Sequence, residues 1–282
     1  METGLKDKVV LVTGASGGIG RAVAEAFAAE GAHLVLQGHG RFGELEQLAA
    51  AGRFGARVTC VRADVARPEE VDAAFERALA AHGRVDVCVA NAGVWPRPDV
   101  PLQRLDPARV RATLDANLFG AVWTARAFAA ALERTGPRSD GHGASIVFTG
   151  STAGRFGERG HLDYAVGKAG LYGLVRTLKN ELVDLDPYAR ANLVEPGWTV
   201  TEMVRAELSD DAVLQRVAST MPLRQLARAK DIARTLVFLS SPLLARHISG
   251  ETLTVAGGME GRLRWKPGEV DAAAMRARLL SE

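Results

Sequence analysis

A single tyrosine in this chain is spaced to act together with a lysine. Tyr164 is followed four residues later by Lys168, whereas an arginine and an asparagine occupy that position after the other two tyrosines. Residues four apart share one face of a helix, so the Tyr164 phenol and the Lys168 ammonium would be neighbours. A nearby positive charge lowers the pKa of a phenol, which suits proton exchange near neutral pH. The spacing therefore indicates general acid–base chemistry, with a solvated Tyr–Lys pair on a helix surface as the alternative.

Two further polar residues stand where such chemistry would need partners. Ser151 ends the run Ile146–Gly150, which has the composition of a buried strand. Open α/β sheets bind ligands beyond the carboxyl ends of their strands, so this is a favourable place for a catalytic hydroxyl. Asn117 precedes Leu118 and Phe119, which predict a buried stretch of helix around it. An asparagine that only caps a helix or faces solvent is the alternative at that position.

The elements that would position these residues alternate between strands and helices. Short apolar runs resemble buried strands, and stripes of apolar residues at helical spacing lie between them. Because parallel strands need helical crossovers, this alternation predicts the α/β class: a single Rossmann-type doubly wound parallel sheet of about seven strands, with helices on both faces. Asp106 and Pro107 resemble an N-cap and a first helical residue, which predicts a long helix from there to about Arg134. The expected strands are Val9–Val12, Leu34–Leu36, Val58–Val61, Val85–Ala90, Ile146–Phe148, Ala191–Val194 and Thr252–Val255.

A glycine-rich turn follows the first of these strands. The segment Thr13–Gly20 has glycine at positions 14, 17, 18 and 20 and opens onto a helical stripe. Glycines allow a tight backbone and the close approach of a diphosphate, while the N–H groups at the helix end attract its negative charge. In this place the segment predicts a dinucleotide-binding site, with a plain turn as the alternative.

The spacing Thr-Gly-x-x-x-Gly-x-Gly resembles the signature of the short-chain dehydrogenase/reductase family. Two later segments extend the resemblance, which runs from about Leu5 to Gly258. Asp64-Val65 follows the third strand, where family members meet the adenine. Asn91-Ala92-Gly93 ends the fourth strand, where they meet the adenosine ribose.

The resemblance implies an oxidoreductase that transfers hydride between a nicotinamide cofactor and a carbonyl or secondary alcohol of a small organic molecule. Ser151 and Tyr164 are thirteen residues apart, the spacing most often found between the catalytic serine and tyrosine of this family. In such an enzyme Tyr164 exchanges a proton with the substrate oxygen and Ser151 hydrogen-bonds that oxygen. Lys168 tunes Tyr164 and contacts the nicotinamide ribose, and Asn117 holds a water that extends the proton relay. No metal is implied.

The segment Pro196–Thr201 resembles the Pro-Gly segment of the family, whose backbone and threonine meet the nicotinamide amide and the phosphates. Tyr164 and Lys168 also belong to the implied cofactor site. The other implied cofactor-binding residues are Gly14, Ser16, Gly17, Gly18, Ile19, Gly20, His39, Arg41, Asp64, Val65, Asn91, Ala92, Gly93, Pro196, Gly197, Thr199 and Thr201.

The residue at the end of the second strand bears on the choice of dinucleotide. Family members that use NAD carry an aspartate there, whereas this chain has Gly38. No carboxylate is present to repel a 2′-phosphate, and His39 and Arg41 could donate to one. Gly17 argues the other way, because many NADP-using relatives carry a basic residue at that position. We therefore expect NADP(H), with NAD(H) as the alternative.

The substrate itself is not indicated by the sequence. In the family, the pocket walls come from the loop after Gly93, the residues between Ser151 and Tyr164, and the segment after Gly197. Two other functions stay open: a dinucleotide-binding regulator or scaffold without turnover, and an α/β domain for another phosphate ligand, which would not explain the tyrosine site. The wall residues expected here are Trp95, Arg97, Arg155, Phe156, Glu158, His161, Trp198 and Met203.

Composition excludes several other classes of protein. The 29 arginines and 6 lysines are interspersed with 33 acidic residues for a net charge of +2, so no basic stripe predicts a nucleic-acid partner. The apolar runs are far shorter than the roughly 20 residues of a membrane-spanning helix. Cys60 and Cys88 lie in strand-like runs and read as buried small hydrophobic residues, without disulfide or metal-binding spacing. With no secretory signal visible, we expect a cytoplasmic enzyme.

We expect residues 1–282 to form a single dinucleotide-binding and catalytic domain, with 262–282 as a C-terminal surface tail that includes a short helix after Pro267-Gly268. Relatives are usually dimers or tetramers that pack the tyrosine-bearing helix against a neighbour. By this resemblance we expect a homo-oligomer, most simply a homotetramer.

Overall fold

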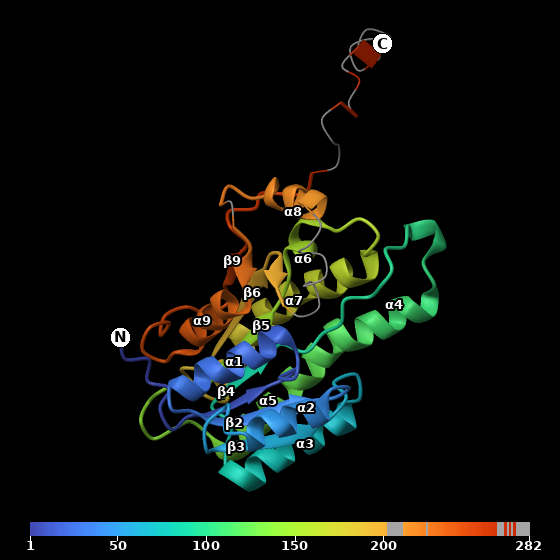
Figure 1. The fold of residues 1–282 in the computed structure, drawn as a ribbon. Helices are drawn as coiled ribbons and strands as arrows, with labels where there is room; N and C mark the ends of the chain where they lie inside the picture. The colour runs from blue at the N-terminus through green and yellow to red at the C-terminus, as the bar shows by residue number, and fades with distance from the viewer. Residues whose placement is uncertain (202–210, 224, 264–267, 270, 272, 275–282) are drawn as a thin grey trace.

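A parallel sheet forms the centre of the molecule (Figure 1). The computed structural model describes residues 1–201, 211–223, 225–263, 268, 269, 271, 273 and 274. Within them, seven strands lie in the order β3-β2-β1-β4-β5-β6-β9, and every neighbouring pair is parallel. The predicted fold class is therefore confirmed. The strands are β1 Val9–Val12, β2 His33–Gly38, β3 Val58–Arg62, β4 Val87–Ala90, β5 Ser145–Thr149, β6 Arg190–Pro196 and β9 Thr252–Val255.

The order of the strands reverses between β1 and β4. After β3 the chain returns across the sheet to place β4 on the other side of β1. In open α/β sheets, ligands bind at such a switch point, beyond the carboxyl ends of the strands. The glycine-rich turn leaves β1 and the Asn-Ala-Gly segment leaves β4, so both lie at this crevice.

Helices cover both faces of the sheet because each crossover carries one. One apolar core lies between the sheet and α3, α5 and α7, and the other lies between the sheet and α1, α2 and α9. Among the described helices, none is both long and apolar enough to cross a membrane. The helices are α1 Gly18–Ala29, α2 Phe42–Ala50, α3 Pro68–His82, α4 Pro107–Leu114, α5 Gly120–Thr135, α6 Thr152–Phe156, α7 Leu162–Glu181, α8 Asp211–Ala218 and α9 Ala229–Ser240.

The long helix expected after Asp106 begins where the sequence predicts but is not regular. Asp106 Oδ1 accepts a hydrogen bond from the Ala108 N–H at 3.0 Å, and Pro107 is the first residue of α4. Between α4 and α5 the residues Asp115–Phe119 form a π-helical turn, after which α5 continues to Thr135. Single π turns inside helices occur frequently at functional sites, and Asn117 lies in this one.

A small second layer, which the sequence did not predict, stands beyond the carboxyl ends of β6 and β9. β7 (Thr199–Val200) pairs in parallel with β8 (Ala227–Arg228). Figure 1 shows α8 at this end of the molecule, next to α6. An apolar cluster of its own holds the layer together and joins Phe156 of α6 to Val213 and Val217 of α8.

Candidate active site

The glycine-rich turn is tight enough to require its glycines. Gly14 has a φ of +64°, and a Cβ added there would lie 2.8 Å from the Cα of Ala92. A Cβ on Gly20 would collide with the carbonyl oxygen of Gly14. At the start of α1, Gly17 gives no side-chain cap, and the first turn contains no acidic residue. The helix therefore presents N–H groups and a positive dipole end to the crevice, which suits an anionic ligand.

Thr13 joins the turn to the Asn-Ala-Gly segment. Its Oγ1 accepts hydrogen bonds from the N–H groups of Asn91 and Ala92, both at 3.0 Å. The Asn91 amide in turn donates to the Thr13 carbonyl at 3.1 Å. The two segments that flank the switch point are thus held together. This role of Thr13 was not predicted from the sequence.

Gln37 is a second residue that the sequence analysis missed. It is buried at the end of β2, where its Oε1 accepts from the Gly14 N–H at 2.8 Å and its amide donates to the carbonyl of Ala63. This glutamine therefore links the glycine turn to the loop that begins with Asp64. The only signal in the sequence was an amide directly after the apolar run Leu34–Leu36.

The loop after β3 has a defined shape around Asp64. The carboxylate accepts from the Ala66 N–H at 3.0 Å, and Glu70 accepts from the Asp64 N–H at 2.7 Å. Val65 is buried against the start of α5, where a Cβ on Gly120 would lie 2.8 Å from its Cγ2.

The end of β2 lies beside β1, next to the glycine turn. Gly38 is the last residue of this strand, and a Cβ added to it would lie 3.6 Å from Ser16 Oγ in the glycine turn. His39 and Arg41 follow in an exposed loop, and Arg41 stands at the N-terminus of α2. This strand end, like the loop up to Arg41, carries no carboxylate.

Asn117 occupies the centre of the π turn with 1% of its surface exposed. Its amide donates to the carbonyls of Thr113 and Val94, both at 3.0 Å, and its Oδ1 accepts from the Val94 N–H at 3.2 Å. A Cβ on Gly93 would lie 2.5 Å from this Oδ1 and 3.2 Å from Lys168 Nζ. The missing side chain of Gly93 therefore lets Asn117 and Lys168 approach the same point.

Ser151 and Tyr164 face each other across the start of α6 and α7. Ser151 is the N-cap of α6, and its Oγ accepts from the Ala153 N–H at 3.1 Å. Burial raises the pKa of the Tyr164 phenol, and a hydrogen bond with Ser151 acts in the opposite direction. The two residues predicted to share a substrate oxygen therefore lie near each other.

Lys168 completes the cluster from the next turn of α7. Its Nζ donates to the carbonyl of Thr149 at 2.8 Å and lies 5.8 Å from the centre of the Tyr164 ring. Burial lowers the pKa of this lysine to about 8. All of the predicted catalytic residues thus gather where β4 and β5 end, as parallel strand ends should.

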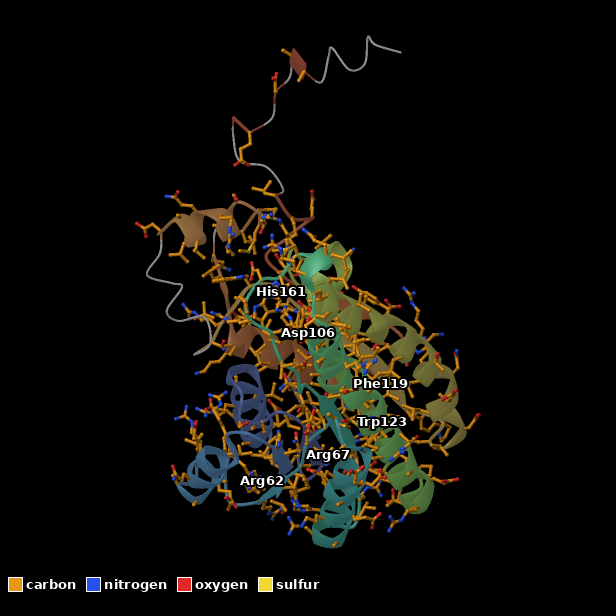
Figure 2. All side chains as sticks on the ribbon, turned by 90° about the vertical axis from the view of Figure 1, so that its right-hand side faces the viewer. Arg62, Arg67, Asp106, Phe119, Trp123 and His161 are labelled. Carbon is orange, nitrogen blue, oxygen red and sulfur yellow. The ribbon has the colours of Figure 1, made fainter. Side chains whose placement is uncertain are left out.

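An aromatic wall stands beside the phenol. The Trp95 ring stacks on the His161 ring with centroids 3.9 Å apart, and it meets the Tyr164 ring edge-on at 4.7 Å. His161 Nε2 hydrogen-bonds the carbonyl of Pro96 at 3.0 Å, so the loop after β4 and the loop before α7 form one surface. Figure 2 shows His161 well above Phe119 and Trp123, which lie on the flank formed by α5.

A buried ion pair fixes the start of α7. Asp163 is fully buried and accepts from Arg109 Nε at 2.9 Å, from Thr113 Oγ1 at 3.1 Å and from the Tyr164 N–H at 3.0 Å. Burial alone would raise the pKa of this carboxyl, but these donors, Arg109 foremost, bring it below its usual value. The pair joins α4 to the residue next to the catalytic candidate.

The Pro-Gly segment lies against the glycine turn. Gly197 donates to the carbonyl of Val255 at 3.0 Å, and Thr199 Oγ1 donates to the carbonyl of Gly197 at 3.0 Å. A Cβ on Gly18 would lie 2.7 Å from the Cβ of Thr201, so this threonine faces the start of α1. Met203, another expected wall residue, lies outside the described residues.

Arg262, the first residue of the expected tail, contacts the loop between Ser151 and Tyr164. Its Nε lies 2.7 Å from Glu158 Oε2, and its Nη2 donates to Thr152 Oγ1 at 3.0 Å. Most of the expected tail after Leu263, including the helix predicted beyond Pro267, lies outside the described residues.

Comparisons with known proteins find relatives along most of this chain. A family model described as enoyl-(acyl carrier protein) reductase matches residues 14–260. L-rhamnose 1-dehydrogenase (NAD(P)(+)) of Azotobacter vinelandii is 36% identical over 263 residues, covering 90% of this chain and 97% of that protein. 3-oxoacyl-(acyl-carrier-protein) reductase of Escherichia coli is 35% identical over 254 residues, covering 89% and 97%. A solved structure from Brucella melitensis, described as a short-chain dehydrogenase/reductase and glucose/ribitol dehydrogenase, superposes with a TM-score of 0.80 at 30% identity, covering 92% of this chain and 98% of that one.

The parallel sheet, its switch point and the gathered polar residues define a dinucleotide-dependent oxidoreductase. The chain belongs to the short-chain dehydrogenase/reductase family. It acts on CH–OH or C=O groups with NAD(P), which confirms the predicted reaction class and type of cofactor.

The residues present fit such a cofactor. The glycine turn offers a cradle that a Cβ at position 14 or 20 would fill, and the uncapped start of α1 supplies N–H groups for phosphates. Thr149, at the end of β5, has a buried Oγ1 that finds no hydrogen-bond partner among the described residues. The crevice is therefore shaped for a ligand that brings both negative charge and polar groups.

Proposed function

We propose that Tyr164 is the general acid and base of this oxidoreductase. When bound, the nicotinamide supplies or accepts the hydride. In carbonyl reduction Tyr164 donates its proton to the substrate oxygen, and in alcohol oxidation the phenolate removes it. The observation that carries this role is the position of the buried Lys168 ammonium, 5.8 Å from the centre of the Tyr164 ring. Ser151 follows the end of β5, and we propose that it hydrogen-bonds the substrate oxygen and holds it against the phenol.

Lys168 and Asn117 are the proposed supporting residues. Below pH of about 8 the buried Lys168 carries a positive charge beside the Tyr164 ring, which favours the phenolate. We propose that its ammonium also binds the ribose next to the nicotinamide. Asn117 reaches the same point through the gap at Gly93 and holds the water that extends the proton relay. Substrate turnover measured for an alanine variant of each residue tests these roles.

We propose that the enzyme prefers NADP(H). The carboxylate-free strand end at Gly38 and the donors His39 and Arg41 support this, because an aspartate there would repel a 2′-phosphate. Michaelis constants for NADPH and NADH, measured side by side, test the preference. A tenfold preference for NADH would contradict it.

A polyhydroxylated compound is the substrate class that the aromatic wall supports best. The Trp95 ring offers an apolar face beside the phenol, and the His161 ring in contact with it brings hydrogen-bonding nitrogens. A sugar presents C–H faces and hydroxyls together, so it matches both kinds of group. L-rhamnose, D-glucose, D-gluconate and a 3-oxoacyl thioester, assayed by cofactor absorbance, distinguish this class from acyl substrates. Reaction with the thioester alone would contradict the proposal.

We propose a homotetramer as the assembly. On the flank of α5 and α7, the apolar residues Phe119, Leu162 and Val166 are each more than 40% exposed (Figure 2 labels Phe119). Such exposed apolar side chains mark interaction surfaces, and a second copy would cover them. Light scattering should give a multiple of the 30.0 kDa chain mass, and Val166→Asp should lower it. A wild-type mass of one chain would contradict the proposal.

We further propose that the enzyme works in the cytoplasm. Its two cysteines are free in β3 and β4, which suits a reducing compartment. Fractionation of cells that produce the protein tests this location.

A further inference from the structure

The two positions that the family resemblance assigns to the 2′-phosphate of NADP carry no side chain in this chain. Gly17 stands at the start of α1 and Gly38 at the end of β2. A Cβ added to Gly38 would lie 3.1 Å from Leu45 Cδ2 in α2 and 3.6 Å from Ser16 Oγ, so the backbone here packs closely against α2 and the glycine turn. A cation that selects NADP therefore has to come from the loop after Gly38 or from a neighbouring strand.

The neighbouring strand places an arginine beside Gly38. In the parallel ladder of β2 and β3, Gly38 pairs with Arg62, and the Ala63 N–H donates to the Gly38 carbonyl at 3.1 Å. Paired residues of adjacent strands point their side chains to the same face, about 4.8 Å apart. Val61 and Ala63 pack in the core under α3 and α5, so Arg62 between them faces the side of α1 and α2.

Arg62 is also free to bind. It is exposed and makes no hydrogen bond or ion pair within the part of the chain that the structure describes. The arginines on either side differ: Arg57 pairs with Asp7 at 3.0 Å and Arg67 with Glu70 at 3.5 Å. Figure 2 labels Arg62 and Arg67, which flank the Asp64 loop.

The charges around this position favour an anion. Glu44 on α2 is already paired with Arg21 at 2.5 Å, so its charge is balanced. Glu46 is the other acid of α2 and acts on Cys60, two residues before Arg62. Asp64 follows Arg62 by two residues, and its carboxylate accepts from the Ala66 N–H. Arg62 is therefore a basic side chain at the end of β3 that neither Glu44 nor Asp64 pairs with.

We propose that Arg62 binds the 2′-phosphate of NADP and is the main residue that selects NADP over NAD. A guanidinium presents a planar fork that matches two phosphate oxygens, and charged pairs of this kind are stronger than neutral hydrogen bonds. The strand register places Arg62 beside Gly38 at the end of β2, and its exposed guanidinium is long enough to reach an anion bound there. This inference rests on the proposed preference for NADP.

The test compares two nucleotides that differ only in the phosphate at issue. Isothermal titration calorimetry measures the binding of adenosine 2′,5′-bisphosphate and of adenosine 5′-monophosphate to the full chain, so no substrate is needed. The wild-type protein should bind the bisphosphate more tightly. Arg62→Ala should weaken bisphosphate binding about ten- to a hundredfold, because a hydrogen-bonded charge is lost, and leave monophosphate binding unchanged. The bisphosphate affinity of Arg62→Lys should lie between those of the wild type and of Arg62→Ala, since lysine keeps the charge but lacks the planar fork of the guanidinium.

A matched control separates this role from a general loss of charge. Arg77 is an exposed arginine of α3 at the outer edge of β3, and Arg77→Ala should change the ratio of the two affinities by less than twofold. Equal wild-type affinities for the two nucleotides would contradict the NADP preference itself. A wild-type preference that survives in Arg62→Ala would overturn only the role of Arg62. Unchanged monophosphate binding in the variant shows that its nucleotide site is folded.

Discussion

Lys168 Nζ donates a hydrogen bond to the carbonyl of Thr149 at 2.8 Å, and this contact ties the catalytic helix α7 to the end of β5. The main-chain oxygen fixes the position of the ammonium before any ligand is present. Ser151 follows Thr149 by two residues, so the end of β5 positions both the serine and the lysine near Tyr164. The spacing of these groups is therefore a property of the scaffold, as precise positioning for catalysis requires.

Removal of the Lys168 charge should move the pH profile of alcohol oxidation. Lys168→Met takes away the cation that favours the Tyr164 phenolate, so the rise of kcat/KM with pH should shift to higher pH. Lys230→Met, an exposed lysine of α9, is the control and should leave the profile unchanged. An identical profile for Lys168→Met would show that the lysine does not tune the phenol.

The same variant should also change stability with a definite sign. The pKa of Lys168 is about 8 in the folded protein, below its ordinary value of 10.5, so the buried charge destabilises the fold at pH below about 8. That cost disappears as pH rises from about 8 to 10.5. Lys168→Met should therefore resist urea better than wild type at pH 7, and the difference should shrink by pH 10. A difference that grows with pH would contradict this sign.

Gly93→Ala should displace catalytic side chains through a single added methyl group. The new Cβ would lie 2.5 Å from Asn117 Oδ1 and 3.2 Å from Lys168 Nζ, so at least one of these groups must move. A displacement of about 1 Å in a catalytic site can lower turnover by up to about 100-fold. Gly43→Ala in α2 is the control, because no atom of the described residues lies within 4 Å of its added Cβ. Equal turnover in Gly93→Ala and wild type would place Asn117 and Lys168 outside the rate-limiting step.

The ion pair of Asp163 and Arg109 should make stability fall in acid. The pKa of Asp163 is lower in the folded chain than in the unfolded chain, where it is about 3.9. Its contribution to the free energy of unfolding is therefore complete above pH of about 3.9 and is lost as the pH falls below that value. Asp163→Asn should destabilise the protein by about 3 kcal/mol at pH 7, since one partner of a buried pair is removed. The difference in urea midpoint from wild type should narrow as pH falls below about 4.

An exposed pair provides the comparison for Asp163. Asp72 and Arg126 are about half exposed. Asp72→Asn should therefore lower the free energy of unfolding by less than about 1 kcal/mol, both at pH 7 and below pH of about 4. If Asp163→Asn cost no more than Asp72→Asn, the buried pair would not hold the start of α7.

Much of the fold and of the catalytic cluster was predictable from the sequence because the signals are local. Apolar runs mark the strands, and the four-residue step from Tyr164 to Lys168 needs only one helix. The π turn at Asn117 was not predictable, since Thr113 and Val94 hold it through contacts of the folded chain. The apolar residues after Asn117 predicted a buried stretch of helix around it but gave no sign of that turn.

Contacts between distant segments account for the other omissions. Gln37 acts on Gly14, 23 residues away, and Arg262 acts on Glu158, 104 residues away. No periodicity records such pairs, because they form only when crossovers bring strand ends and loops together. From the sequence alone, Arg262 could therefore be interpreted only as part of a surface tail.

The most direct test of the proposed chemistry is Tyr164→Phe, measured for turnover and for cofactor binding in the same preparation. Loss of the proton donor should lower kcat by about 10²–10⁴-fold. NADPH at about 100 times its Kd should still stabilise the variant by about 2.7 kcal/mol, as it does the wild type. Tyr188→Phe, an exposed tyrosine, is the control and should keep full activity. Wild-type turnover in Tyr164→Phe would contradict the assignment of Tyr164 as the acid and base.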